Sequence, residues 1–206
     1  MNTQLKTLKI LLLLTAFLLA GLTLAFLLRP QPVETRIAQG DPKLGGDFTL
    51  MSAQGPVSLS DFRGMVTVIY IGYASCPDVC PTALAVLTQA LRNLDETERQ
   101  RVQGIFISVD PERDTPEKLA QYAAFFSPRL IGVTGTREEI DQVVKQYGAF
   151  YRRVEMPDSA LGYAMDHSSR LYLINPEGQL VHTLLHNSSS DELTQHLKQL
   201  LAEEKG

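Results

Sequence analysis

The chain has 206 residues, of which 44% are hydrophobic, and a formal net charge of −4 at pH 7. This length is enough for one well-buried domain with an appendage, and no block recurs at the fixed period of a repeat array. The mild acidity excludes nucleic acid as a partner, because nucleic-acid binding needs a basic stripe that this composition does not supply.

The N-terminus carries a long apolar segment. Residues 10–28, ILLLLTAFLLAGLTLAFLL, contain no charge. A helix that crosses a membrane needs about 20 apolar residues, whereas a cleaved signal peptide has a shorter apolar region of about 7–15 residues. We therefore predict an uncleaved transmembrane helix and cytoplasmic tail within residues 1–29, with a signal peptide as the alternative.

The orientation of this anchor rests on the tail that precedes it. That tail has no acidic residue, and a large following domain translocates largely regardless of its own charge. The tail also lacks the Arg- and Ser-rich amphipathic pattern of a mitochondrial transit peptide. The sequence thus predicts a single-pass protein of the bacterial inner (cytoplasmic) membrane, with its globular domain facing the periplasm or cell exterior.

Residues 30–45 separate the anchor from the globular part. They contain three prolines, two glycines and mixed charges without an apolar period, which is typical of a linker of low order. The globular domain is expected to cover residues 46–206. It opens with DFTLMSAQGPVSLSDF, in which Gly55 and Pro56 interrupt short apolar stretches and predict a hairpin.

Strand and helix patterns then alternate along the domain. Four apolar segments predict strands: residues 65–73, 102–110 and 129–135, and the hairpin at 170–185, whose NPEG supplies a turn. Four segments predict helices: residues 81–94, 115–126, 136–148 and 188–204. Asp114 or Thr115 could cap the second helix, Thr136 and Glu139 form a capping box for the third, and Gly148 ends it. This order predicts an α/β protein with a thioredoxin-like fold.

The two cysteines of the chain stand in YASCPDVCP, where Cys76 and Cys80 occupy the predicted turn between a buried strand and a helix. Alternatively, the two cysteines could simply be small residues of the hydrophobic core. The prolines and the aspartate beside them are unusual for a core. A helix N-terminus lowers the pKa of a thiol, as both redox exchange and metal binding require. Three residues separate the two cysteines, whereas a thioredoxin motif has two. The longer loop lets both sulfurs face one ion and still allows a disulfide. Thiolates suit Cu(I), and a nitrogen ligand would extend the site to Cu(II).

A histidine could supply that nitrogen. His182 and His186 lie roughly 13 Å apart along a strand at about 3.3 Å per residue, too far for a shared ion, and His196 is expected on a solvated helix face. His167 directly precedes the closing hairpin, which in a thioredoxin-like layout lies beside the loop that bears the cysteines. It is therefore the candidate ligand, and a histidine hydrogen-bonded to Asp166 is the alternative.

Three segments now define a resemblance: YASCPDVCP (residues 73–81), FISVDPERDTPEKLAQY (106–122) and DHSSRLYLINPEG (166–178). Together they resemble the Sco/SenC proteins, membrane-anchored copper proteins that assist assembly of the copper centre of cytochrome c oxidase. The resemblance implies copper, as Cu(I), Cu(II) or both, as the cofactor. It implies Cys76, Cys80 and His167 as ligands, and the copper-bearing oxidase subunit as partner.

The residues around these ligands are predicted to play supporting roles. Asp78 and Asp166 could contact the ligands, or Asp78 could simply keep its loop hydrated. Asp110, Arg113 and Asp114 fall in the second matching segment, and we expect them to cap the following helix and to pair with each other.

The resulting hypothesis is a metallochaperone, not an enzyme. The alternative is a thiol–disulfide oxidoreductase that reduces cysteines of a partner before metal insertion, which needs the redox pair Cys76 and Cys80 but not His167. A peroxidase of the peroxiredoxin type lacks support, because neither cysteine has the flanking residues of such a site.

Overall fold

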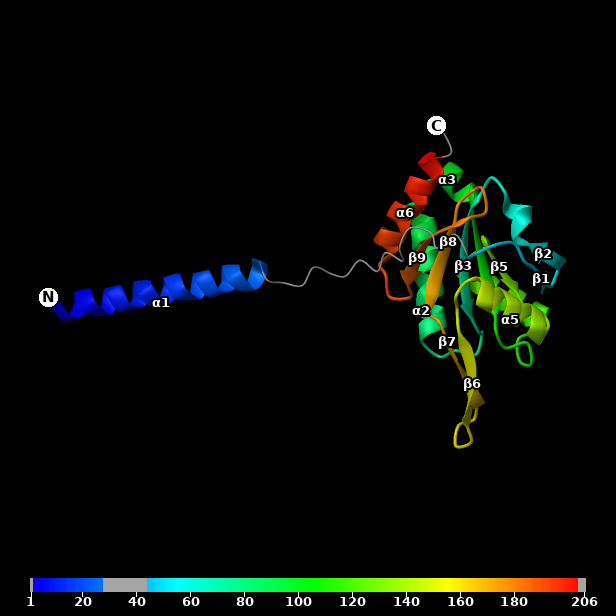
Figure 1. Ribbon diagram of the computed structural model, residues 1–206, viewed down its shortest axis with the longest axis horizontal. Coiled ribbons are helices and arrows are strands. Elements are labelled where there is room, and N and C mark those ends of the chain that lie inside the picture. Colours follow the sequence, from blue (N-terminus) through cyan, green and yellow to red (C-terminus); the bar gives the residue numbers. More distant parts are fainter. Residues whose placement is uncertain (1, 28–43, 204–206) are drawn as a thin grey trace. The chain divides into compact units, whose positions relative to one another are not determined.

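The computed structural model describes residues 2–27 and 44–203 (Figure 1), and the chain divides into two units at residues 35 and 36. The first unit contains helix α1 (Asn2–Leu27). No helix within the described residues combines the length and apolar character that a membrane span requires, so the predicted anchor is unconfirmed. Most of the predicted linker lies outside the described residues.

The second unit opens with the predicted hairpin. Strands β1 (Thr49–Ser52) and β2 (Gly55–Ser58) pair antiparallel, with Thr49 opposite Ser58. Gly55 makes the turn possible because its φ of 119° lies in a region that a side chain would disfavour. A short 3-10 helix, η1 (Leu59–Phe62), follows. The hairpin that the sequence predicts is therefore confirmed.

A five-stranded mixed sheet forms the centre of this unit, in the order β5-β4-β3-β8-β9. Its strands are β3 (Val66–Gly72), β4 (Val102–Ser108), β5 (Leu130–Val133), β8 (Arg170–Ile174) and β9 (Leu180–Leu185). The first three run parallel, β8 pairs antiparallel to β3, and β9 pairs antiparallel to β8. Every residue of β3 and β4 is buried, as expected for β-branched and aromatic strands covered on both faces. The predicted α/β class is confirmed.

Helices flank this sheet (Figure 1), and their bounds are α2 (Val79–Asn93), α3 (Glu96–Gln100), α4 (Pro116–Phe126), α5 (Arg137–Gln146) and α6 (Ser190–Glu203). Helices α2 and α6 pack against each other. The sequence predicts all of these except α3, a five-residue helix capped by Asp95 and Glu98. Such a short helix has too few residues to show an apolar period.

The helix ends agree with local capping chemistry. Thr115 caps α4 by accepting a hydrogen bond from Lys118 N, and Thr136 and Glu139 form the predicted capping box of α5. Gly148 follows that helix with a φ of 59°, which suits glycine at this position.

One boundary differs from the prediction, because α2 begins at residue 79. Cys80 thus belongs to the first helical turn and not to the loop before it.

A further hairpin, absent from the sequence prediction, precedes the closing strands. Strands β6 (Tyr151–Met156) and β7 (Gly162–His167) pair antiparallel as a separate two-stranded sheet. Figure 1 shows this hairpin extending away from the central sheet. Its last residue is His167, so the candidate ligand stands at the end of a strand and not in an irregular loop.

Candidate metal centre

The three candidate ligands come together in space. The ligand atoms of Cys76, Cys80 and His167 all lie within 4.8 Å of one another, and both cysteines are buried free thiols. His167 Nε2 lies 3.3 Å from Cys80 Sγ, although 87 positions separate the two residues. Within the part of the chain that the structure describes, this is the one group of at least three Cys, His, Asp or Glu residues able to hold an ion.

The neighbours of Cys80 fix its position in the cluster. It is fully buried in the first turn of α2, and its sulfur fits against the end of β3. A Cβ atom placed on Gly72 would lie 2.7 Å from Cys80 Sγ, closer than real contacts allow. Gly72 therefore provides the space for this sulfur, a role that the sequence analysis missed because glycine in an apolar strand carries no chemical signal of its own.

The two thiols differ in acidity. The hydrogen bond from Cys80 lowers the pKa of Cys76, and hydrogen bonds from His167 and from the backbone N–H groups of Asp78 and Cys80 act in the same direction. Burial, followed by the hydrogen bond with Cys76, raises the pKa of Cys80. Cys76 is thus the thiolate of the pair and Cys80 the thiol that donates to it, as desolvation and hydrogen bonding together dictate.

His167 is oriented by aromatic rings and by its own backbone. Its ring stands edge-to-face against Tyr70 and Tyr73, with centroid distances of 6.2 and 5.8 Å. Its Nδ1 lies 3.3 Å from the carbonyl oxygen of Ser168. A carbonyl can only accept, so Nδ1 donates in this contact, and Nε2 faces the sulfur of Cys80. This arrangement resembles the way proteins commonly orient a metal-binding histidine.

Asp114 holds the loop that carries Cys76. It is fully buried, and its Oδ2 accepts hydrogen bonds from Ala74 N at 2.7 Å and from Ser108 Oγ at 2.6 Å. Its Oδ1 accepts from Lys118 Nζ at 2.9 Å. The prediction that Asp114 caps α4 is therefore wrong, because both of its oxygens are used by these contacts and Thr115 provides the cap.

Arg113 connects the same turn to strand β7. It forms the predicted ion pair with Asp110, at 2.5 Å, and donates to the carbonyl oxygens of Leu161 and Tyr163. Its guanidinium lies 3.6 Å from the ring centroid of Tyr163, whose hydroxyl donates to Asp110. These contacts tie the strand that ends in His167 to the core.

The two aspartates nearest the ligands in sequence contribute less than expected. Asp78 is exposed at the start of α2, and its side chain makes no capping hydrogen bond. Asp166 pairs with Arg152 at 2.5 Å across the hairpin. The alternative of an Asp166–His167 hydrogen bond is therefore wrong, because successive side chains of a strand point to opposite faces.

Two of the other histidines lie together away from this cluster. The rings of His182 and His196 have centroids 4.6 Å apart. His196 is half-buried, and its Nδ1 has no hydrogen-bond partner. The expectation that His196 stands on a solvated face is therefore wrong, because its helix packs that face toward β9.

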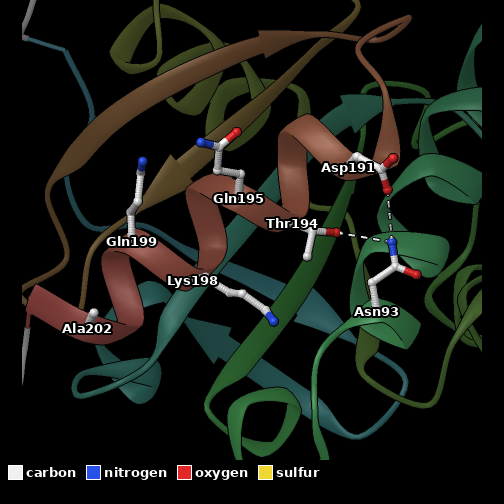
Figure 2. A pocket seen from close by; sticks show the side chains of 7 residues that line it. All are labelled: Asn93, Asp191, Thr194, Gln195, Lys198, Gln199 and Ala202. Atoms are coloured by element: carbon white, nitrogen blue, oxygen red, sulfur yellow. Dashed lines mark hydrogen bonds between the residues drawn. The ribbon is translucent and has the colours of Figure 1, made fainter.

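An open polar hollow lies elsewhere, between α6 and the end of α2 (Figure 2). Asn93 Nδ2 there donates to Asp191 Oδ1 at 3.4 Å and to Thr194 Oγ1 at 3.3 Å. Asn93 ends α2 whereas Cys80 lies in its first turn, which places them about 20 Å apart at 1.5 Å per residue. The hollow therefore contributes nothing to the thiol–imidazole cluster.

The chemistry of the cluster suits a soft or borderline transition metal. It offers two sulfurs, one of them favoured as thiolate, and one imidazole nitrogen. Thiolates select Cu(I) or Zn, and an added imidazole suits Cu(II) as well. The fold and the cluster together define a thioredoxin-like protein with a dithiol–imidazole group that could hold a metal ion.

Comparison with known proteins identifies the family. A profile of the SCO1/SenC family matches residues 37–202, and the chain belongs to this family. It is 34% identical over 206 residues to the "SCO2-like protein" of Rickettsia felis, covering 96% of this chain and 99% of that protein. The family resemblance expected from the sequence is thereby confirmed.

Solved structures agree with this assignment. Arabidopsis thaliana ScoI, crystallised with copper bound, is 37% identical with a TM-score of 0.72, covering 78% of this chain and 99% of the other. BsSco is 26% identical with a TM-score of 0.61, covering 79% of this chain and 96% of the other. Its structure is described as identifying a disulfide switch in a member of the Sco family of cytochrome c oxidase assembly proteins.

Proposed function

We propose that this protein is a membrane-anchored copper chaperone that binds copper through Cys76, Cys80 and His167. The observation that carries the proposal is the convergence of the three ligand atoms within 4.8 Å. The buried sulfurs and the oriented imidazole support copper in particular, because this donor set accommodates both of its oxidation states. The copper bound in the Arabidopsis relative supports the same cofactor here.

The proposed role is assembly of the copper centre of cytochrome c oxidase, with the copper-bearing oxidase subunit as partner. Family membership supports this role, since BsSco is described as an oxidase assembly protein. The bound metal would be cargo held by the three side chains. The Cys80 proton must leave on binding, because metal binding requires the thiolate.

The proposed location is the bacterial inner membrane, with the globular domain on the periplasmic side. Its support is the charge-free run at residues 10–28 and the tail without acidic residues. A reporter fused after Gly206 of the full chain tests this. We expect activity outside the cytoplasm, and a cytoplasmic signal would contradict the location.

The second candidate function is thiol–disulfide exchange with a partner. It is favoured by the lowered pKa of Cys76 beside the Cys80 thiol, because exchange requires an attacking thiolate and a neighbouring resolving sulfur. The two functions are compatible, since a dithiol outside the cytoplasm must be kept reduced before it can bind metal.

The variant His167→Ala separates the two functions. If the imidazole completes a copper site, the variant should lose Cu(II) affinity and the thiolate-to-Cu(II) absorption, while Cys76 and Cys80 still form their disulfide. The cluster of the reduced full chain should bind about one copper in preference to zinc, measured by competition. Unchanged Cu(II) absorption and affinity in His167→Ala would remove the three-ligand site and leave thiol exchange.

Two further variants show whether the effect of His167→Ala is specific to the cluster. His186→Ala removes a histidine that is not part of the cluster and should leave copper binding unchanged. Cys76→Ser should abolish both the thiolate-to-Cu(II) absorption of the cluster and disulfide formation, because one remaining thiol can neither complete this site nor close a disulfide within the chain.

A further inference from the structure

A pair of imidazoles lies where strand β9 meets helix α6, outside the thiol–imidazole cluster. His182 is exposed on β9, the last strand in the sheet order, and His196 lies half-buried on α6. Their ring centroids are 4.6 Å apart, with the ring planes inclined by 46°. The pairing joins two elements that the chain brings together only on folding, so spacing in the sequence does not reveal it.

The separation of the two rings matches a shared metal ion. A first-row transition ion lies about 2.0–2.1 Å from an imidazole nitrogen, so two rings on one ion at roughly a right angle have centroids roughly 4.5 Å apart. The observed 4.6 Å is therefore compatible with an ion held between the two rings. A right angle at the metal is the tetragonal preference of Cu(II) and Ni(II).

The hydrogen bonding of the pair leaves a nitrogen without a partner. His196 Nδ1 is buried and has no hydrogen-bond partner, and an unpaired buried polar atom is costly. An ion held between the rings would supply a partner at this place. An ion could reach the pair from solvent, because His182 is exposed.

The local charges also favour a cation. Glu203 lies seven positions after His196, two turns along the same face of α6, and its charge acts on His182. Burial and the neighbouring His196 lower the pKa of His182, so its ring is neutral and has an available lone pair near pH 7. Water could complete the coordination of a borderline divalent ion.

We propose that His182 and His196 form a second metal site, selective for divalent first-row ions and tightest for Cu(II). Its all-nitrogen and oxygen donors distinguish it from the sulfur-containing cluster, which favours the softer Cu(I). The two sites lie on different parts of the fold, one at the start of α2 and one between β9 and α6. The second site does not depend on the function proposed above.

The test uses the untagged full chain in a background that lacks the first cluster, Cys76→Ser, Cys80→Ser and His167→Ala. Cu(II) alone is the probe, with affinity measured by competition against a chelator and the ligands identified by electron paramagnetic resonance. We expect about one Cu(II) with coupling to two nitrogens. Adding His182→Ala should weaken binding by at least about 100-fold, since even indirect changes around a metal ligand cost about 10–100-fold.

The control is His186→Ala in the same background, which removes a nearby histidine outside the pair and should leave Cu(II) affinity unchanged. His182→Gln provides a second form of the test at an exposed position, where folding is least affected, and circular dichroism verifies the fold. Equal Cu(II) affinity with and without His182 would show that the two rings are only packed together and would overturn the site. Loss of binding in His186→Ala to the same extent would overturn it as well.

Discussion

Asp114 and Ala74 are 40 positions apart in the chain and are joined by a hydrogen bond of 2.7 Å from the backbone N–H of Ala74 to Asp114 Oδ2. Ala74 stands two residues before Cys76, so this bond fixes the loop that presents the first sulfur of the cluster. The same oxygen accepts from Ser108 Oγ at the end of β4. A carboxylate in the family segment thus acts on the metal centre through the backbone and without contacting a metal.

Replacing Asp114 with Ala should weaken both the fold and the site. We expect the free energy of unfolding to fall by about 1–3 kcal/mol for each buried donor left unpaired, and copper affinity to fall because the Cys76 loop loses its support. Asp114→Asn retains an acceptor and should recover part of both losses. Urea unfolding and copper titration measure the effect. Glu117→Gln changes an exposed carboxylate in the first turn of α4 and should alter neither.

Local signals in the sequence predict much of this fold. The continuous apolar run of β3 and the capping box of α5 are properties of neighbouring residues, and both are found as predicted. The three candidate ligands predicted from the sequence also come together in space. The cysteine spacing and the position of His167 before a strand carry that information, and the family resemblance strengthens it.

What the sequence does not reveal depends on long-range contacts or on weak patterns. Strand β6 is half-exposed along its length and contains three charged residues, so no buried alternating face marks it. The bond between Asp114 and Ala74 and the pairing of His182 with His196 join distant segments. Such contacts follow from the assembled fold and leave no trace in the local spacing of the residues.

The acidity of Cys76 should appear in its alkylation rate. An ordinary thiol has a pKa of about 8.5 and reacts about tenfold more slowly for each pH unit below it. Because hydrogen bonding from Cys80 lowers the pKa of Cys76, its labelling by iodoacetamide should stay nearly constant from pH 8 to pH 6. Cys80, whose pKa burial raises, should label slowly throughout. Mass spectrometry of the reduced, metal-free chain resolves the two sites.

The control for this behaviour is the removal of the donor. Cys80→Ala deletes the S–H group that contributes most to the lowered pKa, so labelling of Cys76 should become steeply pH-dependent. Cys80→Ser keeps a donor and should retain part of the effect. A steep pH dependence of Cys76 in the unaltered chain would contradict the proposed thiolate.

Gly72 should be required for the geometry of the metal centre. In Gly72→Ala the new Cβ would lie 2.7 Å from Cys80 Sγ, and overpacking of this kind costs about 1–3 kcal/mol. We expect lower stability together with weaker copper binding, because the sulfur must move. Gly104→Ala is the matched control, since its Cβ would meet Leu130 at 2.9 Å on the neighbouring strand pair. It should lose stability but keep copper affinity, and equal losses of copper affinity in both would contradict the role of Gly72.

His182 should make the stability of the metal-free protein depend on pH. Its pKa is lowered from the ordinary value of 6.5, first by burial and then by His196, so the folded state resists the proton that the unfolded chain accepts. The stabilising contribution is therefore present above about pH 6.5 and is lost as the pH falls through the lowered folded-state value. We expect the difference in unfolding free energy between pH 7.5 and pH 5.5, measured with urea, to shrink in His182→Gln. His186→Gln should leave that difference unchanged, and an equal pH dependence in His182→Gln and the unaltered chain would show that His182 does not contribute.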